Sequence, residues 1–391
     1  MCYYIIGGYV RNIGIICEYN PFHNGHLFHI NKIKEMYPES NIILVLSGNV
    51  TERGELSILD KWDKTEIALH FGVDLVVELP FIQASQAADI FCYGAVKLLS
   101  LLKADTIVFG SETNDVERLK KCAHIQLYDK RYNDIVAQLL DKGMNYPTAL
   151  SKALCEVSGI NISSPNDLLG LGYVKEIMKN EYAIEPITIQ RTNDYHAELI
   201  TDFISSATSI RLALKNNNDI KNTVPQFVLP YLNKKVYFLA DYFEFLKYKI
   251  LSESDLTIYQ TVDKDITSRI NRYIVDSNTL EEFVNKIKTK YYTYNRLMRM
   301  CSHILFSLTK EEASAKHDIS YIRLLGFSSK GKKHLNTIKK ELDIPLITSY
   351  TNDKKGYLDI EMKITKTLGI LKGKEFVDAE YKNQPIYKEK M

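Results

Sequence analysis

Two histidines stand three residues apart around a glycine, in the segment Glu18-Tyr19-Asn20-Pro21-Phe22-His23-Asn24-Gly25-His26. Pro21 indicates a turn, and Gly25 lets the backbone approach a ligand closely where a helix begins. The free N–H groups at a helix start favour phosphate. The imidazoles of His23 and His26 can then donate hydrogen bonds to charge that develops on a phosphorus as pyrophosphate leaves. We therefore expect nucleotide chemistry here, with His23 and His26 as catalytic residues.

Other interpretations of these histidines exist. His29 follows three residues after His26, so the group could be a metal site, or structural histidines at a helix start. No cysteine or clustered carboxylate completes a ligand set. The six cysteines form no Cys-x-x-Cys pair and are interpreted as reduced thiols. The strand–turn–glycine–helix context favours the nucleotide interpretation, and we predict no protein-made metal site.

Further polar residues follow expected strand ends. Gly110, in Phe109-Gly110-Ser111-Glu112, would permit close approach of an adenine or ribose, or serve as a simple turn glycine. The segment from Ser205 to Arg211 places small hydroxyl residues at a helix start with an arginine one turn in. That arrangement suits phosphates, or a plain N-cap. Arg191 and Asn166 have no role on physical grounds alone.

The elements that must position these residues alternate strand and helix. Apolar runs predict strands over 12–17, 41–46, 74–79, 105–109 and 186–190, and helical patterns occupy 26–37, 60–71 and 82–102. This order predicts an α/β fold with a Rossmann-like, doubly wound parallel sheet. Ligands bind such sheets at the carboxyl ends of the strands.

Past Val224 the pattern becomes mainly helical. Helices are expected over 238–251, 268–276, 280–290 and 295–308, with Thr279 and Glu282 spaced as a capping box, and a short strand over 344–348. We therefore predict a catalytic domain over 1–224 and a mainly α-helical domain over 225–391.

Composition narrows the class of protein. The chain has 391 residues, 45% of them hydrophobic and 25% charged, which excludes a disordered chain, a collagen-like repeat and a coiled-coil rod. No apolar run is long enough to span a membrane and no signal peptide is evident, so a cytoplasmic protein is expected. Residues 1–224 carry 21 Lys and Arg against 27 Asp and Glu, whereas 225–391 carry 29 against 21. The basic half fits either an RNA partner or a lysine-rich solvated surface.

An ordered series of segments resembles one family. The segments are Asn20 to His26, Arg53-Gly54-Glu55, Asp60-Lys61-Trp62, Gly72 to Pro80, Phe109 to Glu112, Ser164-Pro165-Asn166, Arg191 with Tyr195-His196, Ser206 to Arg211, and Tyr321 to Phe327. Together they resemble the His-x-Gly-His nucleotidyltransferase superfamily and, within it, the bacterial tRNA(Met) cytidine acetate ligases. The resemblance implies that ATP activates acetate as acetyl-adenylate, and that N4 of the wobble cytidine of elongator tRNA(Met) receives the acetyl group.

The resemblance also assigns residues. It implies catalytic roles for His23, His26 and Arg211, with ATP as the nucleotide and Mg²⁺ as its counter-ion. It implies ATP contacts at Ile16, Cys17, Glu18, Tyr19, Asn20, Pro21, Phe22, His23, Asn24, Gly25, His26, Leu27, Phe28, His29, Gly110, Asn166, Arg191, Thr192, Ser206 and Thr208. Met1 is interpreted as an upstream start, because family members usually begin later.

Three positions depart from the family pattern. Glu52 stands where an amide is expected, Lys64 where an arginine is more usual, and Gly172 where an acidic residue is more usual. None of the three belongs to the histidine pair. If the loop that holds Glu52 contacts RNA, its added negative charge weakens binding.

In the basic half, Arg296, Arg299, Lys330, Lys332 and Lys333 are candidate RNA contacts, or parts of a solvated helix face. Two other functions remain open. One is a small-molecule adenylyltransferase or carboxylate–amine ligase of pantothenate-synthetase type, which has little use for an extra basic domain. The other is an RNA- or nucleotide-binding module without chemistry, which has no need for the histidine pair.

Overall fold

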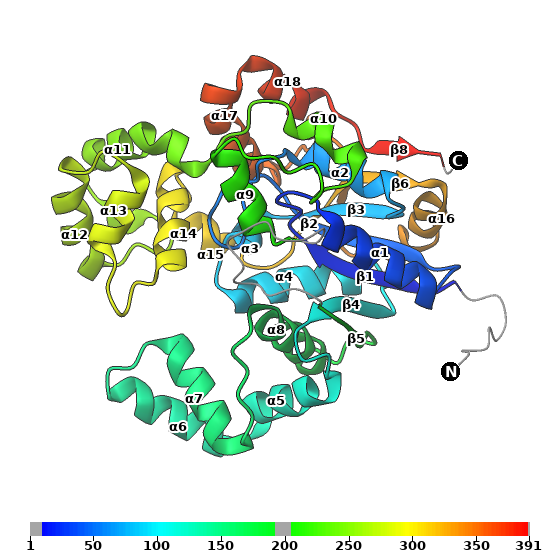
Figure 1. Ribbon diagram of the computed structural model, residues 1–391, viewed down its shortest axis with the longest axis horizontal. Coiled ribbons are helices and arrows are strands. Elements are labelled where there is room, and N and C mark those ends of the chain that lie inside the picture. Colours follow the sequence, from blue (N-terminus) through cyan, green and yellow to red (C-terminus); the bar gives the residue numbers. More distant parts are fainter. Residues whose placement is uncertain (1–9, 192–204, 390–391) are drawn as a thin grey trace.

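The computed structural model describes residues 10–191 and 205–389. At its centre is one sheet with strand order β5-β4-β1-β2-β3-β6-β7, and β8 pairs with β6 (Figure 1). The strands are β1 (Asn12–Cys17), β2 (Asn41–Ser47), β3 (Leu75–Leu79), β4 (Thr106–Ser111), β5 (Glu185–Gln190), β6 (Ile322–Ser328), β7 (Leu346–Ile347) and β8 (Ile386–Lys388). The first five strands are parallel, in the order expected for a doubly wound nucleotide-binding fold.

Helices cover both faces of the sheet and extend beyond its edges. They are α1 (Asn24–Met36), α2 (Lys61–His70), α3 (Phe81–Ala84), α4 (Ala88–Leu101), α5 (Val116–Tyr128), α6 (Lys130–Asp141), α7 (Tyr146–Ser158), α8 (Pro165–Lys179), α9 (Ala207–Lys215), α10 (Leu229–Leu232), α11 (Phe243–Ser252), α12 (Lys264–Val275), α13 (Leu280–Ile287), α14 (Tyr294–Leu305), α15 (Lys310–Ala315), α16 (Ser329–Ile338), α17 (Asp359–Lys372) and α18 (Lys374–Lys382). No helix within the described residues is both long and apolar enough to cross a membrane.

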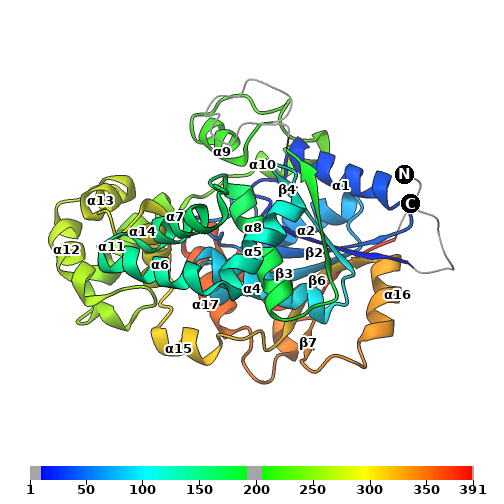
Figure 2. The same ribbon diagram turned by 90° about the horizontal axis from the view of Figure 1, so that it is seen from below.

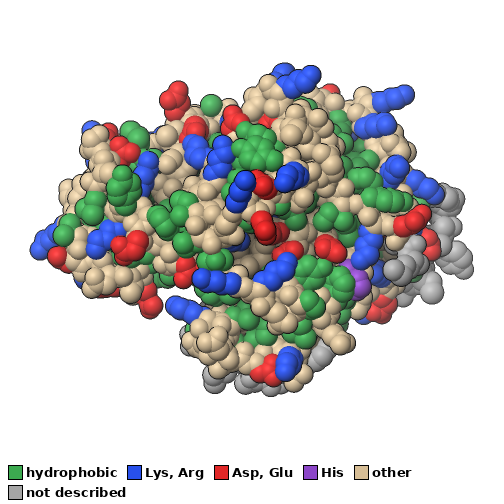
Figure 3. Space-filling view, turned by 90° about the horizontal axis from the view of Figure 1, so that it is seen from above, with side chains coloured by type: hydrophobic (Ala, Val, Ile, Leu, Met, Phe, Trp, Pro, Cys, Tyr) green, Lys and Arg blue, Asp and Glu red, His purple; other side chains and the backbone are tan. Residues whose placement is uncertain are grey.

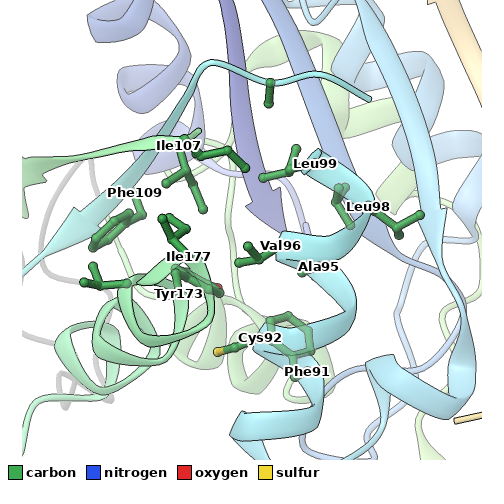
Figure 4. Packing of buried hydrophobic residues seen from close by; sticks show 14 of the residues in the cluster. Phe91, Cys92, Ala95, Val96, Leu98, Leu99, Ile107, Phe109, Tyr173 and Ile177 are labelled. Atoms are coloured by element: carbon green, nitrogen blue, oxygen red, sulfur yellow. The ribbon is translucent and has the colours of Figure 1, made fainter. Parts of the chain in front are cut away.

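Alternation along the buried strands separates two cores. Ile43 and Val45 of β2 belong to a cluster with helices α4, α5 and α8 on one face. Ile42, Leu44 and Leu46 belong to a second cluster with α1, α2 and α9 on the other face. Successive side chains of a strand point to opposite faces, so a continuous apolar run fills both cores. Figure 4 shows the first core where α4 and α8 meet β4.

A third core lies outside the sheet. It joins α11, α12, α13 and α14, which we call the helical lobe, and it also includes residues of α3 and α17. Figures 1 and 2 place this lobe at one end of the molecule and α16 at the other. At the start of α13 the Thr279 hydroxyl caps the helix as expected, accepting from the Glu282 N–H at 3.1 Å. The Glu282 carboxylate accepts from the N–H of Asn278 at 2.8 Å.

Among the elements that differ from the sequence expectation, two change the architecture. The helix expected over 82–102 is two helices, α3 and α4, because the chain turns at Ser85, whose carbonyl accepts a hydrogen bond from His303 at 2.8 Å. The strand β6 was not expected at all, and it runs antiparallel to β3. The sheet therefore draws on both sides of Val224, where the sequence indicated a boundary.

Candidate active site

A cavity of about 290 Å³ opens at the carboxyl ends of β1 and β4. These two strands are neighbours, and strand order reverses between them, which is where doubly wound sheets bind ligands. Most of the predicted ATP contacts line this cavity: Ile16, Cys17, Glu18, Tyr19, Asn20, His23, Gly25, His26, Phe28, His29, Gly110, Asn166, Arg191, Ser206 and Thr208, together with the predicted catalytic residue Arg211. The structure brings together residues that the sequence spreads over almost two hundred positions.

His23 and His26 are fixed by the start of α1. His23 is the N-cap residue, and its Nδ1 accepts a hydrogen bond from the Gly25 N–H at 3.1 Å. The Nδ1 of His26 accepts from the His23 N–H at 3.2 Å. The two rings stack with centroids 3.8 Å apart. The capping box thus holds both imidazoles in one orientation.

Burial keeps these histidines neutral. Burial, together with the nearby positive charges of Arg191 and Arg211, lowers the pKa of His23 to about 3. Burial also lowers the pKa of His26 well below its usual value. Because Nδ1 of each ring accepts a hydrogen bond, the proton of the neutral ring is on Nε2. Each ring can therefore offer one Nε2–H donor to an anion in the cavity.

His29 carries its proton on the other ring nitrogen than His23 and His26 do. Burial lowers its pKa to about 4, and the ring hydrogen-bonds the Val108 backbone. Its Nε2 is buried without a partner, so the bond to the Val108 carbonyl comes from Nδ1–H. The neutral ring then presents Nε2 as an acceptor rather than a donor.

Arg211 projects from α9 toward the histidine loop. It donates to the Asn20 carbonyl at 2.9 Å and pairs with Glu55 at 2.9 Å. Ser206 is the N-cap of α9, and its hydroxyl accepts from the Ser209 N–H at 3.1 Å. A phosphate near this helix start would compete with the Glu55 carboxylate for the Arg211 guanidinium.

A second cation lies at the ends of β4 and β5. Arg191 donates to Asn166 at 3.5 Å, and Asn166 donates to Glu112 at 2.5 Å. A Cβ added at Gly110 would lie 3.1 Å from the Arg191 side chain, so the glycine makes room for this arginine. Burial lowers the pKa of Arg191, and the charge of Glu112 opposes that shift.

The three departures from the family pattern each have a structural explanation. Lys64 is fully buried, and its ammonium donates to the carbonyls of Ser47 and Gly48, each at 2.7 Å. Burial lowers its pKa to about 7. Gly172 packs on α4, because a Cβ there would lie 2.5 Å from the sulfur of Cys92. Glu52 lines the cavity and pairs with Arg299 at 3.1 Å.

The sequence did not reveal the apolar wall of the cavity. Phe91, Phe109, Leu169, Tyr173 and Ile189 line it. Figure 4 shows Phe91 on α4, Phe109 on β4 and Tyr173 on α8. Glu55 was also missed as a cavity residue, whereas Glu52, which was expected only in a loop that could meet substrate, lines the cavity as well.

Some predicted contacts do not line the cavity. Phe22 is fully buried in the core, and Leu27 packs against the same cluster. The Asn24 side chain donates to the Asn222 carbonyl at 2.8 Å, and Pro21 shapes the turn before α1. Thr192 lies outside the described residues.

The five candidate RNA contacts fall into two separate places. Arg296 and Arg299 belong to α14, where Arg296 pairs with Asp263 at 2.7 Å. Lys330, Lys332 and Lys333 belong to α16. This helix begins near the amino ends of the parallel strands, whereas the cavity lies at their carboxyl ends. The cap of α16 shows this placement, because the Ser328 hydroxyl donates to Asp74, just before β3, at 2.6 Å. On the face in Figure 3, basic and acidic side chains are interspersed without one continuous basic patch.

No group of three or more His, Cys, Asp and Glu side chains within the described ranges has the geometry of a metal site. Three carboxylates, those of Glu18, Glu52 and Glu55, do line the cavity. The Glu18 carboxylate accepts from the Glu52 N–H at 2.6 Å.

Comparison with known proteins gives one consistent result. A family model described as HIGH Nucleotidyl Transferase matches residues 10–383. A tRNA(Met) cytidine acetate ligase of Geobacillus sp. (strain WCH70) is 40% identical, covering 88% of this chain and 90% of the relative. One from Caldicellulosiruptor saccharolyticus is 36% identical, covering 97% and 99%.

Two solved structures share the fold of this chain. The apo crystal structure of Thermotoga maritima TmcAL superposes with a TM-score of 0.90 at 28% identity, covering 97% of this chain and all of the other. The same protein bound with alpha-thio ATP superposes with a TM-score of 0.88 at 27% identity.

Proposed function

The chain belongs to the HIGH nucleotidyl transferase family and, within it, to the tRNA(Met) cytidine acetate ligases, and we propose that it uses ATP to acetylate N4 of the wobble cytidine of elongator tRNA(Met). The observation that carries the proposal is the pair of neutral histidines at the start of α1. Their Nδ1 atoms are occupied by backbone N–H groups, so two Nε2–H donors are available where phosphate binds best.

In the first step, acetate attacks the α-phosphorus of ATP. Acetate is ionised at neutral pH, so this step needs no general base. One acetate oxygen bonds to phosphorus, and the bond from phosphorus to the pyrophosphate oxygen breaks. His23 and His26 donate to the charge that builds up there, and Arg211 transfers from Glu55 to the phosphates.

In the second step, the cytidine amine attacks the acetyl carbon of acetyl-adenylate. The new C–N bond forms, the bond from the acetyl carbon to the phosphate oxygen breaks, AMP leaves, and the amine loses one proton. A wobble base lies in a single-stranded loop, so it can leave its stack at modest cost and enter the cavity. A tRNA substrate also implies a cytoplasmic location.

Magnesium fits this site as a companion of the nucleotide. Mg²⁺ is commonly held by one or two carboxylates together with substrate phosphates, and Glu18 and Glu55 supply carboxylates on the cavity wall. When bound, the ion would neutralise part of the triphosphate charge.

The remaining site and RNA assignments belong to the same proposal. The residues from Ile16 to His29 that line the cavity, with Gly110, Asn166, Arg191, Thr192, Ser206 and Thr208, bind ATP. Arg296 and Arg299 contact RNA near the cavity. Lys330, Lys332 and Lys333, on α16, contact the tRNA body.

The decisive experiment mixes the protein with ATP, Mg²⁺, isotopically labelled acetate and unmodified elongator tRNA(Met), and reads the anticodon fragment by mass spectrometry. An acetyl-sized gain at the wobble cytidine that needs both ATP and acetate supports the proposal. Acetate-dependent ATP–pyrophosphate exchange without that gain would point to another acceptor, such as the amine of a small molecule. Loss of both activities would exclude the ligase.

The surface assignment has its own test. Charge reversal of Lys332 and Lys333 to glutamate should weaken tRNA binding and reduce its salt dependence, because fewer phosphate contacts release fewer counter-ions. Acetate-dependent exchange should stay unchanged. A filter-binding series at several salt concentrations measures this, and unchanged tRNA affinity would remove α16 from the RNA surface.

A further inference from the structure

The cavity is lined from both faces of the sheet. His23, His26 and Arg211 line it from the face that α1 and α9 cover. Phe91 on α4 and Tyr173 on α8 line it from the other face. In a displacement at phosphorus, the attacking and leaving oxygens lie roughly in line on opposite sides of the phosphorus. Because Arg211 and the start of α9 suit the departing pyrophosphate, we expect the attacking carboxylate on the side of α4 and α8.

Helix α8 presents one continuous stripe to the cavity. Asn166, Leu169 and Tyr173 all line it, and their spacing of three and four residues puts them on one face of the helix. Asn166 accepts from Arg191 at 3.5 Å, among the proposed nucleotide contacts. A helix rises 1.5 Å per residue, so Tyr173 lies about 10 Å farther along α8 than Asn166. The stripe therefore leads away from the nucleotide contacts to a separate part of the cavity.

The hydroxyl of Tyr173 has no protein partner. The residue is only 5% exposed, and its ring makes an edge contact with Phe109 at a centroid distance of 5.6 Å. Within residues 10–191 and 205–389 the hydroxyl makes no hydrogen bond to the protein. It is not fully enclosed, as the unpaired hydroxyl of Tyr19 is, so it is open to the cavity. A polar group in such a position costs free energy unless a ligand or water pairs with it.

The chemistry around this hydroxyl suits a short carboxylate. Burial raises the pKa of Tyr173 well above its usual value, so the phenol stays an O–H donor. A donor of this kind pairs well with a carboxylate oxygen. Phe91, Phe109 and Leu169 line the same part of the cavity with apolar surface, which suits a methyl group.

Two acidic side chains of the cavity are already paired. The Glu18 carboxylate accepts from the Glu52 N–H at 2.6 Å, and the Glu52 carboxylate pairs with Arg299 at 3.1 Å. Arg53 also lines the cavity and contributes positive charge. These pairings reduce the repulsion that an acetate anion meets as it enters.

We propose that Tyr173, together with Phe91, Phe109 and Leu169, forms the acetate subsite. The Tyr173 hydroxyl donates to one carboxylate oxygen while the other oxygen attacks the α-phosphorus, and the apolar side chains surround the methyl group. The phenol proton stays on Tyr173 throughout. This inference rests on the proposed function and adds to it the residues that select a small carboxylate.

The first test measures acetate-dependent ATP–pyrophosphate exchange by the full chain. Tyr173→Phe removes the hydroxyl and keeps the ring, so the KM for acetate should rise about tenfold to a hundredfold, as for a lost hydrogen bond to a charged group. The KM for ATP should stay near the wild-type value. Tyr132→Phe is the matched control, because Tyr132 is equally buried in the same core but is not a lining residue of the cavity.

The second test enlarges the apolar side of the subsite. Leu169→Ala makes room for one more methylene, so the ratio of kcat/KM for propionate to that for acetate should rise at least about tenfold in the same exchange assay. Leu139→Ala, which shortens a partly buried leucine of the same core on α6, is the control and should keep the wild-type ratio.

Three outcomes would overturn the inference. An unchanged KM for acetate in Tyr173→Phe would exclude the hydroxyl as a contact. An equal rise in the KM values for acetate and ATP would make Tyr173 a nucleotide contact. An unchanged propionate-to-acetate ratio in Leu169→Ala would place the methyl group elsewhere. If the wild-type protein shows no acetate-dependent exchange, the proposed function fails first, and the two failures are thereby distinguished.

Discussion

Two regions of this molecule that bury charged groups give them different kinds of partner. Beneath α18, the Glu380 carboxylate pairs with Lys61 at 3.0 Å and accepts from the Trp62 indole at 3.1 Å. Lys61 also pairs with Glu78 at 2.9 Å, and these charged side chains are at most 5% exposed. In this cluster each carboxylate is matched by donors that the protein itself supplies.

At the cavity the pairing is incomplete. His29 has a buried Nε2 without a partner, and Arg211 is paired with Glu55, which a phosphate can replace. His303 in the helical lobe is an instructive contrast: its pKa is also lowered to about 4, yet Nε2 bonds to Ser85 and Nδ1 lies within reach of Gln260. Burial and a shifted pKa occur in both regions, so neither alone marks a site. At the cavity, the unfilled Nε2 of His29 and the exchangeable partner of Arg211 belong to residues that line a space a ligand can fill.

The largest effect should come from breaking the buried cluster. Glu380→Ala leaves Lys61 with one carboxylate fewer and Arg323 unpaired in the core, so we expect a loss of about 3–5 kcal/mol in the free energy of unfolding. Urea denaturation measures it, and Glu375→Ala, at an exposed position on the same helix, is the control. A loss no larger than that of the control would show that the cluster is not structural.

A slightly smaller effect, of a different kind, is expected at the cavity. His26→Ala removes one Nε2–H donor, which should lower the rate of acetate-dependent ATP–pyrophosphate exchange by about 10²–10³. Stability should change only by the modest value of a helix cap. His124→Ala, at an exposed position on α5, controls for loss of a histidine. Near-normal exchange would remove His26 from the catalytic residues.

The smallest effect is expected at Glu52, which lines the cavity but is also paired with Arg299 of the helical lobe. Burial raises the pKa of Glu52 to about 7 although Arg299 opposes the shift. Between about pH 4.5 and 7 the Glu52 carboxyl is therefore protonated in the folded state but ionised in the unfolded chain. The free energy of unfolding consequently falls as the pH rises through that window.

Glu52→Gln, which imitates the protonated form, should therefore gain about 1 kcal/mol at pH 8 and little at pH 4.5. Thermal unfolding at the two pH values measures the gain. Glu35→Gln, at an exposed position on α1, is the control. An equal gain at both pH values would mean that the Glu52 charge is not the cause.

The sequence predicts those parts of the fold that depend on local pattern. The four inner parallel strands appear as apolar runs because both of their faces are largely buried, whereas β5 at the edge of the sheet is only partly buried. Strand β6 was not predicted because Arg323 and Gly326 interrupt its run of apolar residues. The Arg323 charge can be buried because it pairs with Glu380, which is distant in the sequence.

In the candidate site too, the residues that depend on local pattern were predictable and those that depend on packing were not. Residues that follow strand ends, such as His23 and Gly110, were expected together because carboxyl ends of parallel strands meet at one edge. The apolar wall was not, since Phe91 and Tyr173 reach the cavity only through the packing of α4 against α8. Pairs such as Glu52 with Arg299 depend on contacts across the whole chain and leave no local signal.

The antiparallel strand β6 has a consequence for the order of synthesis. Until Ile322–Ser328 leaves the ribosome, β3 is an uncovered edge of an otherwise assembled parallel sheet. At the usual pace of translation this exposure lasts on the order of tens of seconds. Edge strands invite pairing with other chains, and an inward charge discourages it. Glu78 in β3 provides such a charge, with its early partner Lys61 already translated, so the nascent chain carries its own protection against aggregation before the last helix arrives.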